Sequence, residues 1–214
     1  MVFFHGIFEE EKKGKGPLPS FMQVDLFRAL WILGQGKISR KALSQKLGIG
    51  EGSTRSILNH FSKRKIVKIT QQGCSLTNAG QAVLSEIKHA VIGVSEVKGS
   101  PITFNQPAFG IHLKGLAHKL NKGLEERDEA IRAGAFGATV LVVNKGRFAF
   151  PGLKINDFDR EVAKELKENF SSKDGDVLIL GYSHNELAAE RGAWNAAVYL
   201  LKKCGKNAPK LRVS

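Results

Sequence analysis

Residues 38–61 read ISRKALSQKLGIGEGSTRSILNHF, and this stretch decides the fold of the first part of the chain. Ser39 is a favoured helix N-cap residue, so the stretch predicts a helix over residues 40–47. Gly48 permits a sharp turn, after which a second helix is expected over residues 51–64. Apolar side chains recur in that helix at helical spacing, which predicts one buried face made by Ile57, Leu58 and Phe61.

The residues on either side of this stretch predict a small domain. Residues 22–33 carry apolar side chains every three or four positions and indicate a preceding helix. Residues 66–70 and 74–76 are expected to pair as a hairpin, and Thr77 is expected to cap a fourth helix. The first 19 residues, with several Gly, Pro and Lys, are interpreted as an arm.

This order of helices and hairpin resembles the winged helix-turn-helix of many prokaryotic regulators. The small Ala42 and the turn residue Gly48 stand where two closely crossing helices need them. The resemblance implies that helix 51–64 enters the major groove of double-stranded DNA. Two positions depart from the usual pattern, because Gly50 replaces a Ser or Thr cap and Lys65 stands where glycine is common.

The charge of the chain favours the same function. The net charge is +13, and residues 36–70 hold nine Lys and Arg against one acidic residue. Concentrated positive charge suits the phosphate backbone, although a solvated basic face on a thermostable protein would give the same count. The residues predicted to contact DNA are Arg55 and Asn59 at base edges, Ser53 and Ser56 at bases or phosphates, Lys63, Arg64 and Lys68 at the backbone, and Arg40 and Lys41 beside them.

The second half of the chain predicts a different kind of domain. Strands are expected at residues 102–104, 109–113, 138–143, 147–150 and 177–180, with helices at 117–133, 158–170 and 185–203. Strands that alternate with helices, plus one hairpin, indicate an α+β or mixed α/β domain. The predicted organisation is a DNA-binding domain with its arm (1–92), a linker rich in Gly and Ser (93–101) and an α+β domain (102–214), so the fold class expected for the chain is α+β.

A strand-turn-helix near the end of the chain is the candidate binding site of that domain. Ser183 with Glu186 matches a capping box, and a helix N-terminus just beyond a strand end suits a phosphate or carboxylate. The residues predicted to bind a small anionic effector are Tyr182, Ser183, His184, Asn185 and Arg191. Capping boxes after strands are common, so a purely structural role for these residues stays open.

Other function classes have weaker support in the sequence. No catalytic motif occurs, and the two cysteines, Cys74 and Cys204, lack metal-type spacing, so no catalysis, metal or cofactor is expected. A small enzyme with Asp128, Glu129 or Glu186 as acid or base, or a nucleotide-binding protein, remains an alternative, with the winged helix as a protein-interaction module. RNA is less favoured than DNA, because Phe61 is the only aromatic residue of the basic stretch and is expected to face inward.

Two further strings extend the resemblance to nearly the whole chain. Residues 127–139 (RDEAIRAGAFGAT) and 181–195 (GYSHNELAAERGAWN), taken with the N-terminal part, resemble an archaeal family of largely uncharacterised winged-helix proteins. The C-terminal domain of that family has no assigned function, so the resemblance implies a regulator without adding a site. No apolar run is long enough to cross a membrane and no signal peptide is recognisable. The sequence therefore predicts a cytoplasmic, homodimeric transcriptional regulator with no membrane partner.

Overall fold

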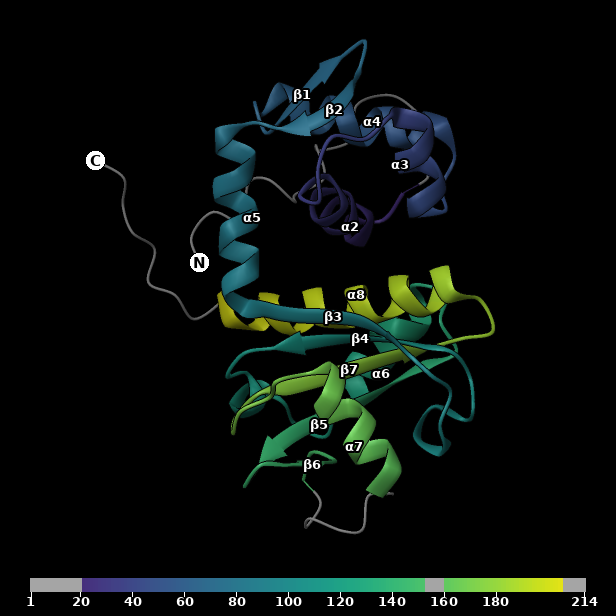
Figure 1. The fold of residues 1–214 in the computed structure, drawn as a ribbon, viewed down its shortest axis with the longest axis vertical. Helices are drawn as coiled ribbons and strands as arrows, with labels where there is room; N and C mark the ends of the chain where they lie inside the picture. The colour runs from purple at the N-terminus through teal and green to yellow at the C-terminus, as the bar shows by residue number, and fades with distance from the viewer. Residues whose placement is uncertain (1–20, 153–159, 206–214) are drawn as a thin grey trace, which may run out of the picture. The chain divides into compact units, whose positions relative to one another are not determined.

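The computed structural model describes residues 21–152 and 160–205; the predicted arm and the side chain of Cys204 lie outside this part of the chain. The chain divides into two compact units, residues 1–88 and 89–214, and each is described by itself. Figure 1 labels the helices and strands of both. In the described residues no helix is both long enough and apolar enough to cross a membrane.

The N-terminal unit has the order of elements that the sequence predicts. Its elements are α2 (Gln23–Leu33), α3 (Arg40–Leu47), α4 (Glu51–Lys63), the antiparallel strands β1 (Val67–Thr70) and β2 (Gly73–Leu76), and α5 (Asn78–Ala90). A single bridge joins Ile38 to Cys74 and extends the hairpin by one short segment. Thr77 caps α5 as expected, since its hydroxyl accepts a hydrogen bond from the Gly80 amide (3.1 Å).

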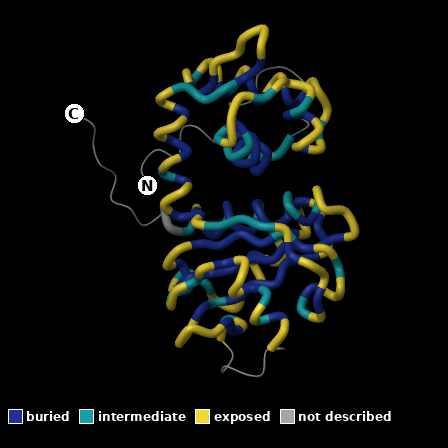
Figure 2. The backbone as a smooth tube through the Cα atoms, viewed as in Figure 1, coloured by how far each residue is buried: buried dark blue, intermediate teal, exposed yellow. Residues whose placement is uncertain are grey.

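One side of each helix in this unit is buried. The fully or nearly fully buried side chains include Phe27, Leu30, Leu43, Leu47, Ile57, Leu58, Phe61 and Ile66. They come from α2, α3, α4 and the start of the hairpin, so the hydrophobic effect holds α4 against the other two helices along its predicted inner face. Figure 2 shows these inner faces in dark blue and the hairpin tip in yellow.

The C-terminal unit is built on one five-stranded sheet. Its elements are β3 (Val91–Val97), the 3₁₀ turn η1 (Pro101–Thr103), β4 (Ala108–Leu113), η2 (Ala117–Lys119), α6 (Leu124–Arg132), β5 (Gly137–Asn144), β6 (Arg147–Ala149), α7 (Arg160–Asn169), β7 (Val177–Tyr182) and α8 (Glu186–Gly205). The strand order is β3-β4-β7-β5-β6, and every neighbouring pair is antiparallel. With helices beside antiparallel sheets, the described chain belongs to the α+β class.

Helices cover both faces of this sheet (Figure 1). On one face α8 contacts β4 and β7, and α6 contacts both α8 and β5. Gly181 lets α8 approach β7 closely, because a Cβ there would lie 2.5 Å from the Ala189 carbonyl oxygen and the Ala193 amide. On the other face, Val162 and Leu166 of α7 join a core cluster with strand residues such as Leu141 and Leu180.

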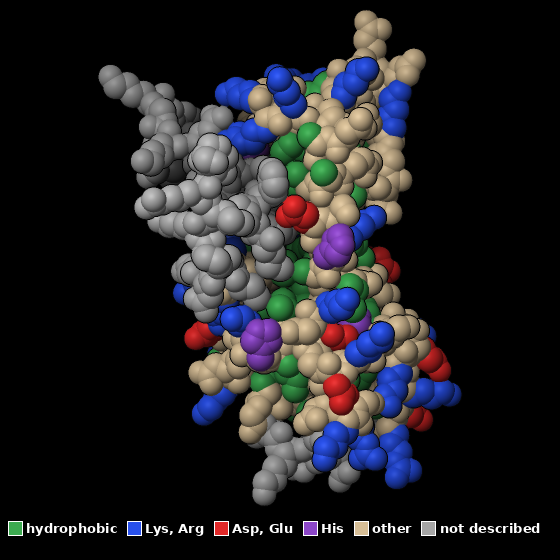
Figure 3. Space-filling model, turned by 90° about the vertical axis from the view of Figure 1, so that its left-hand side faces the viewer, with side chains coloured by type: hydrophobic (Ala, Val, Ile, Leu, Met, Phe, Trp, Pro, Cys, Tyr) green, Lys and Arg blue, Asp and Glu red, His purple; other side chains and the backbone are tan. Residues whose placement is uncertain are grey.

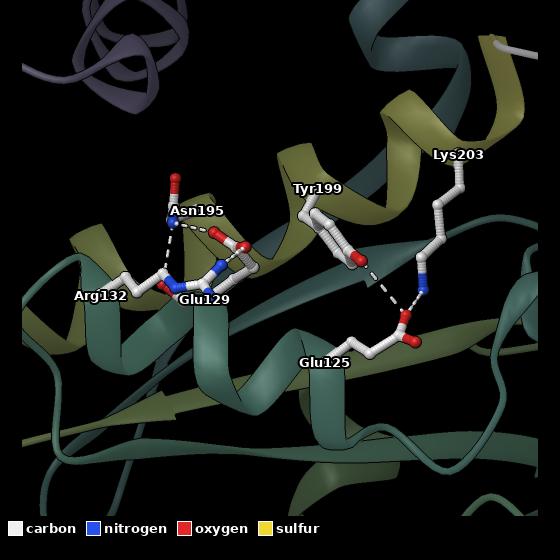
Figure 4. Close-up of polar contacts among 6 residues, drawn as sticks. All are labelled: Glu125, Glu129, Arg132, Asn195, Tyr199 and Lys203. Atoms are coloured by element: carbon white, nitrogen blue, oxygen red, sulfur yellow. Dashed lines mark hydrogen bonds and ion pairs between the residues drawn. The ribbon is translucent and has the colours of Figure 1, made fainter.

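A polar seam ties α6 to α8 (Figure 4). The Lys203 ammonium bonds the carboxylates of Glu125 and Glu126, the latter at 2.9 Å. The Tyr199 hydroxyl donates to Glu125 (3.2 Å). Farther along, Asn195 donates from its amide to the carbonyl and carboxylate oxygens of Glu129 (2.8 and 3.1 Å). These contacts fix how α6 lies along α8.

Three expectations about this half of the chain are wrong. The linker predicted over 93–101 consists largely of β3, because its backbone pairs with β4 over the whole strand. The strand predicted at 102–104 is instead η1, which starts at a proline and is closed by a hydrogen bond from the Ser100 amide to the Thr103 hydroxyl (3.0 Å). The helix predicted from residue 117 begins only at Leu124, since Gly123 takes a left-handed conformation (φ +76°) that a continuous helix cannot contain.

Candidate nucleic-acid interface

The turn between α3 and α4 is defined by local hydrogen bonds. The Ser39 hydroxyl accepts from the Ala42 amide (3.1 Å), which confirms the predicted cap of α3. Gly48 ends α3 in the left-handed conformation (φ +65°). The Ser44 hydroxyl then donates to the Ile49 carbonyl (2.7 Å) across the turn. The start of α4 is therefore held by backbone geometry, since its N-cap Gly50 supplies no side-chain bond.

A buried arginine that the sequence analysis did not single out holds α3 against α2. Arg28 is fully buried and its guanidinium donates to the carbonyl oxygens of Leu47 (2.8 Å) and Lys46 (3.4 Å) at the end of α3. Asp25, also fully buried, lies 3.4 Å from the same guanidinium and accepts the Met22 amide (2.8 Å). The guanidinium thus donates hydrogen bonds to carbonyl groups at the end of α3, which have no partners within that helix. A charged residue inside an apolar helix pattern is the signal that could have found it.

The exposed side of α4 carries most of the side chains predicted to contact bases. Arg55, Ser56, Asn59 and Lys63 are all exposed. Arg55, Asn59 and Lys63 are four residues apart, so they follow one another along a single side of the helix. This row of exposed side chains from Arg55 to Lys63 is called the α4 stripe below.

Ser53 does not belong to the α4 stripe, contrary to expectation. Only 8% of Ser53 is exposed. It lies four residues before Ile57 and eight before Phe61, so the helical repeat turns it to their buried side. Ser56 stays on the surface and donates its hydroxyl to the Gly52 carbonyl (3.1 Å).

The end of α4 is unusual in its backbone and its side chains. Lys65, at the position where glycine was expected, takes the left-handed conformation (φ +56°), and the next amide, Ile66, bonds back to the Phe61 carbonyl (2.9 Å). Arg64 is half-buried and folds back on the helix, where it donates to the His60 carbonyl (3.2 Å) and lies 3.1 Å from the His60 ring nitrogen. Arg64 is thus turned back along its own helix, whereas Lys63 is exposed.

Basic side chains surround α3, α4 and the hairpin. Arg40, Lys41 and Lys68 are exposed, as predicted for residues that would meet phosphates. The Lys37 ammonium donates to the Gln72 side chain at the hairpin turn (2.6 Å). Figure 3 views this unit from the side of α5, and the Lys and Arg side chains visible there (blue) gather toward the end that carries the hairpin. Cys74, in strand β2 of the hairpin, is buried, and burial raises the pKa of its thiol, which stays neutral at pH 7.

The residues predicted to bind an anionic effector have other partners. Asn185, not Ser183, caps α8, because its side-chain oxygen accepts from the Leu187 and Ala188 amides (2.8 and 3.3 Å). Ser183 and Tyr182 are buried, and Arg191 is half-buried. His184 lies 2.6 Å from the Gln106 side-chain oxygen and stacks edge-on against Phe136 (4.2 Å between ring centres).

The hollow beside the start of α8 has the wrong charge for that effector. It encloses about 880 Å³ and is lined by Glu96, Glu165, Glu186 and Glu190 with Lys98. Four carboxylates around one hollow repel an anion. The described residues contain no group of three or more His, Cys, Asp or Glu placed to hold a metal ion.

Comparisons with known proteins find two consecutive regions of similarity. Residues 25–82 match the family model described as "PH0730-like, N-terminal domain", and residues 104–200 match "Domain of unknown function (DUF4443)". No curated protein matches the chain. Neither family description names a DNA-binding or regulatory function, so the resemblance to winged-helix regulators stays a prediction.

A solved structure resembles the chain over most of its length. It is described as "Hypothetical protein PH0730 from Pyrococcus horikoshii OT3", is 26% identical, and superposes with a TM-score of 0.73 over 86% of this chain and 95% of that one. The chain is therefore similar to an archaeal protein over most of its length; residues 25–82 are similar to a PH0730-like N-terminal domain and residues 104–200 to a domain of unknown function.

Proposed function

We propose that this chain is a transcriptional regulator that binds double-stranded DNA through a winged helix-turn-helix, with α4 in the major groove. The observation that carries the proposal is the α4 stripe. It presents a guanidinium, a carboxamide and an ammonium in one row on a helix whose opposite side is buried.

The chemistry of the α4 stripe suits the edges of base pairs. Arg55 can donate two hydrogen bonds to guanine, and Asn59 can pair with adenine through one donor and one acceptor. Lys63, at the far end of the helix, is placed for a phosphate. The hairpin turn carries Gln71 and Gln72 where related wings often carry arginines, so base recognition should depend on α4 more than on the hairpin.

Selection of genomic DNA fragments by the purified full chain tests the proposal. We expect a short preferred sequence to be enriched. Arg55→Ala should relax the preference at one base position at a cost of about 1–3 kcal/mol, because a paired base edge loses its partner. Lys63→Ala should weaken binding to every sequence and lower the salt dependence of log K by about one unit of slope.

Lys114→Ala is the matched control, since it removes an exposed positive charge of the C-terminal unit. It should change neither sequence preference nor salt slope. Equal loss on every sequence for Arg55→Ala and Lys63→Ala would contradict major-groove reading. No enrichment of any DNA would contradict the function and would favour a protein-interaction module.

For the C-terminal unit we propose dimerisation or the binding of a small effector, without catalysis, in a protein that acts in the cytoplasm. Two of the carboxylates considered for an enzyme are engaged in pairs: Asp128 with Arg127 (2.9 Å), and Glu129 with Arg132 and Asn195. Such pairing supports a structural role for Glu129, whereas the exposed pair of Asp128 with Arg127 adds little to the fold.

A further inference from the structure

A second hollow of the C-terminal unit lies where α6 begins. It encloses about 410 Å³ between η1, the start of α6, β5 and the end of β6. Six of its lining residues matter for the argument, namely Phe104, Lys122, Leu124, Arg127, Phe150 and Tyr182. Sites for small molecules in proteins commonly enclose about 300–1,000 Å³, so the hollow has the size of a small-ligand site.

The walls of this hollow are apolar and unusually exposed. Phe104, Leu124 and Phe150 have 73%, 50% and 39% of their surface exposed. Phe104 also takes the left-handed conformation (φ +52°), which is unfavourable for a bulky side chain. Its ring lies 5.7 Å from that of Tyr182. The fold thus holds an aromatic ring in water, at a cost in backbone strain, beside a second ring that lines the same hollow.

The rim of the hollow is positively charged. Lys122 and Arg127 line it, and no Asp or Glu does. Burial raises the pKa of Tyr182, which lines the same hollow, and the positive charge of Arg127 opposes this effect. Arg127 also bonds Asp128 (2.9 Å), but both side chains are about half exposed, so water screens the pair and the guanidinium can share a second anion.

We propose that this hollow binds a small molecule that carries an aromatic ring and a carboxylate. The ring would lie against Phe104 and Phe150, and the carboxylate would meet Lys122 and Arg127. Flat apolar walls favour a ring over a flexible chain, and two cations without a lining carboxylate favour an acid over an amide. The site shares Tyr182 with the effector site expected from the sequence but not the other residues of that set.

Titration of the isotope-labelled full chain, followed by the NMR signals of its backbone amides, tests the assignment. The probe is indole-3-acetate, compared with indole-3-acetamide, which lacks the charge, and cyclohexylacetate, which lacks the aromatic ring. We expect indole-3-acetate to shift the amides of Gly123, Leu124 and Thr139 and to bind at least about 5-fold more tightly than either comparison compound. Failure of indole-3-acetate to bind at up to about 10 mM, or shifts confined to other parts of the chain, would overturn the proposal.

Variants test the contact with the aromatic ring and the contact with the carboxylate separately. Phe104→Ala should weaken indole-3-acetate by about 3- to 10-fold through the lost ring contact, and because Phe104 is exposed the fold should survive. Lys122→Gln should reduce the preference for indole-3-acetate over indole-3-acetamide. Phe136→Ala is the matched control, since Phe136 is equally aromatic and 50% exposed but does not line the hollow. Equal weakening by Phe136→Ala would overturn the placement of the ring.

The face could instead contact a second copy of the chain. If Phe104→Ala turned a dimer into a monomer in sedimentation while no acid bound the wild-type protein, the hollow would be a subunit contact and the proposal would fail. Binding is measured without DNA, so this failure and a failure of the proposed DNA-binding function would be recognised separately.

Discussion

At the scale of single residues, the C-terminal unit contains a buried carboxylate, that of Asp176, whose charge its partners must compensate. It is 3% exposed, yet it accepts hydrogen bonds from the backbone amides of Gly115 (2.8 Å) and Lys173 (2.9 Å) and pairs with His112 (2.9 Å). Burial opposes its ionisation, but these partners outweigh burial and hold the pKa of Asp176 below its ordinary value of 3.8. One carboxylate thus joins two segments, 112–115 and 173–176, that are far apart in the sequence.

Asp176→Asn should lower the free energy of unfolding by about 3 kcal/mol at pH 7, because the amide group turns a donor toward groups that already donate. The folded pKa is depressed, so the stabilisation by the carboxylate is complete above the unfolded value near 3.8 and is lost as the pH falls through the lower folded value. Urea unfolding at pH 7 and at acidic pH measures this. The gap between wild type and variant should narrow below about pH 4.

Asp174→Asn is the control for this prediction. Asp174 accepts the Gly146 amide (2.8 Å) in an exposed position, so its replacement should cost under about 1 kcal/mol. A gap for Asp176→Asn that stayed constant into strong acid would show that the carboxylate charge is not what stabilises the fold.

Lys65 shows strain in the N-terminal unit. A non-glycine residue at φ +56° pays a steric cost that glycine avoids. Lys65→Gly should therefore raise the free energy of unfolding by about 0.5–1 kcal/mol, reduced from the full strain by the greater freedom of glycine in the unfolded chain. Lys65→Ala removes the charge and keeps the strain, so in urea unfolding it should give no such gain; an equal gain from both variants would locate the effect in the charge.

At the scale of elements, the contact between α5 and the start of the hairpin, just before β1, leaves no room for a side chain. A Cβ at Gly80 would lie 2.2 Å from the Ile66 carbonyl oxygen, which is backbone and cannot turn away. Gly80→Ala should lower the free energy of unfolding by about 1–3 kcal/mol, because α5 must shift away from the hairpin. Thermal or urea unfolding of the full chain measures the loss.

The same substitution on α4 should act in the opposite direction. Gly52 is exposed, and a Cβ there would meet no atom within 4 Å. Gly52→Ala should raise the free energy of unfolding by about 0.5–1 kcal/mol, since alanine favours the helix. A gain in stability from Gly80→Ala as well would contradict the close packing of α5.

What the sequence could predict at this scale was local. Ser39 and Gly48 specify a cap and a turn within a few residues, and the structure has both as expected. β3 was missed because Gly93 and Ser95 resemble linker residues, whereas the strand exists through pairing with β4. The cap of α8 was misplaced for a related reason: Ser183 fits a local motif, but its amide bonds the Pro107 carbonyl (3.2 Å), and the chain leaves the sheet before Asn185 can start the helix.

For the candidate sites, too, the sequence predicted what depends on a local pattern and missed what depends on contacts between distant segments. The exposure of Arg55 and Asn59 follows from helical periodicity and was predicted. The hollow lined by Phe104, Lys122 and Phe150 was not, because five separate segments of the chain form it and these three residues belong to no motif. A sequence does not show which aromatic residues are exposed until the fold has shown which of them are buried.

At the scale of the whole molecule, the size of the α4 stripe determines how the proposed regulator must assemble. From Arg55 to Lys63 the helix advances about 12 Å, which matches only three or four base pairs. Such a short site recurs too often in a genome for one copy to find its target. We therefore expect two copies related by a two-fold axis, each reading half of a palindrome, with half-site centres about 10 base pairs apart.

Changing the spacing of the selected site tests this assembly. Inserting about 5 base pairs between the half-sites turns one of them to the opposite side of the duplex, so two linked copies can no longer engage both. Affinity measured by fluorescence anisotropy should then fall by at least about 100-fold toward that of a half-site, while scrambling the same central base pairs without changing their number should cost far less. Unchanged affinity after the insertion would mean that the copies bind independently, and the C-terminal unit would then have no part in pairing them.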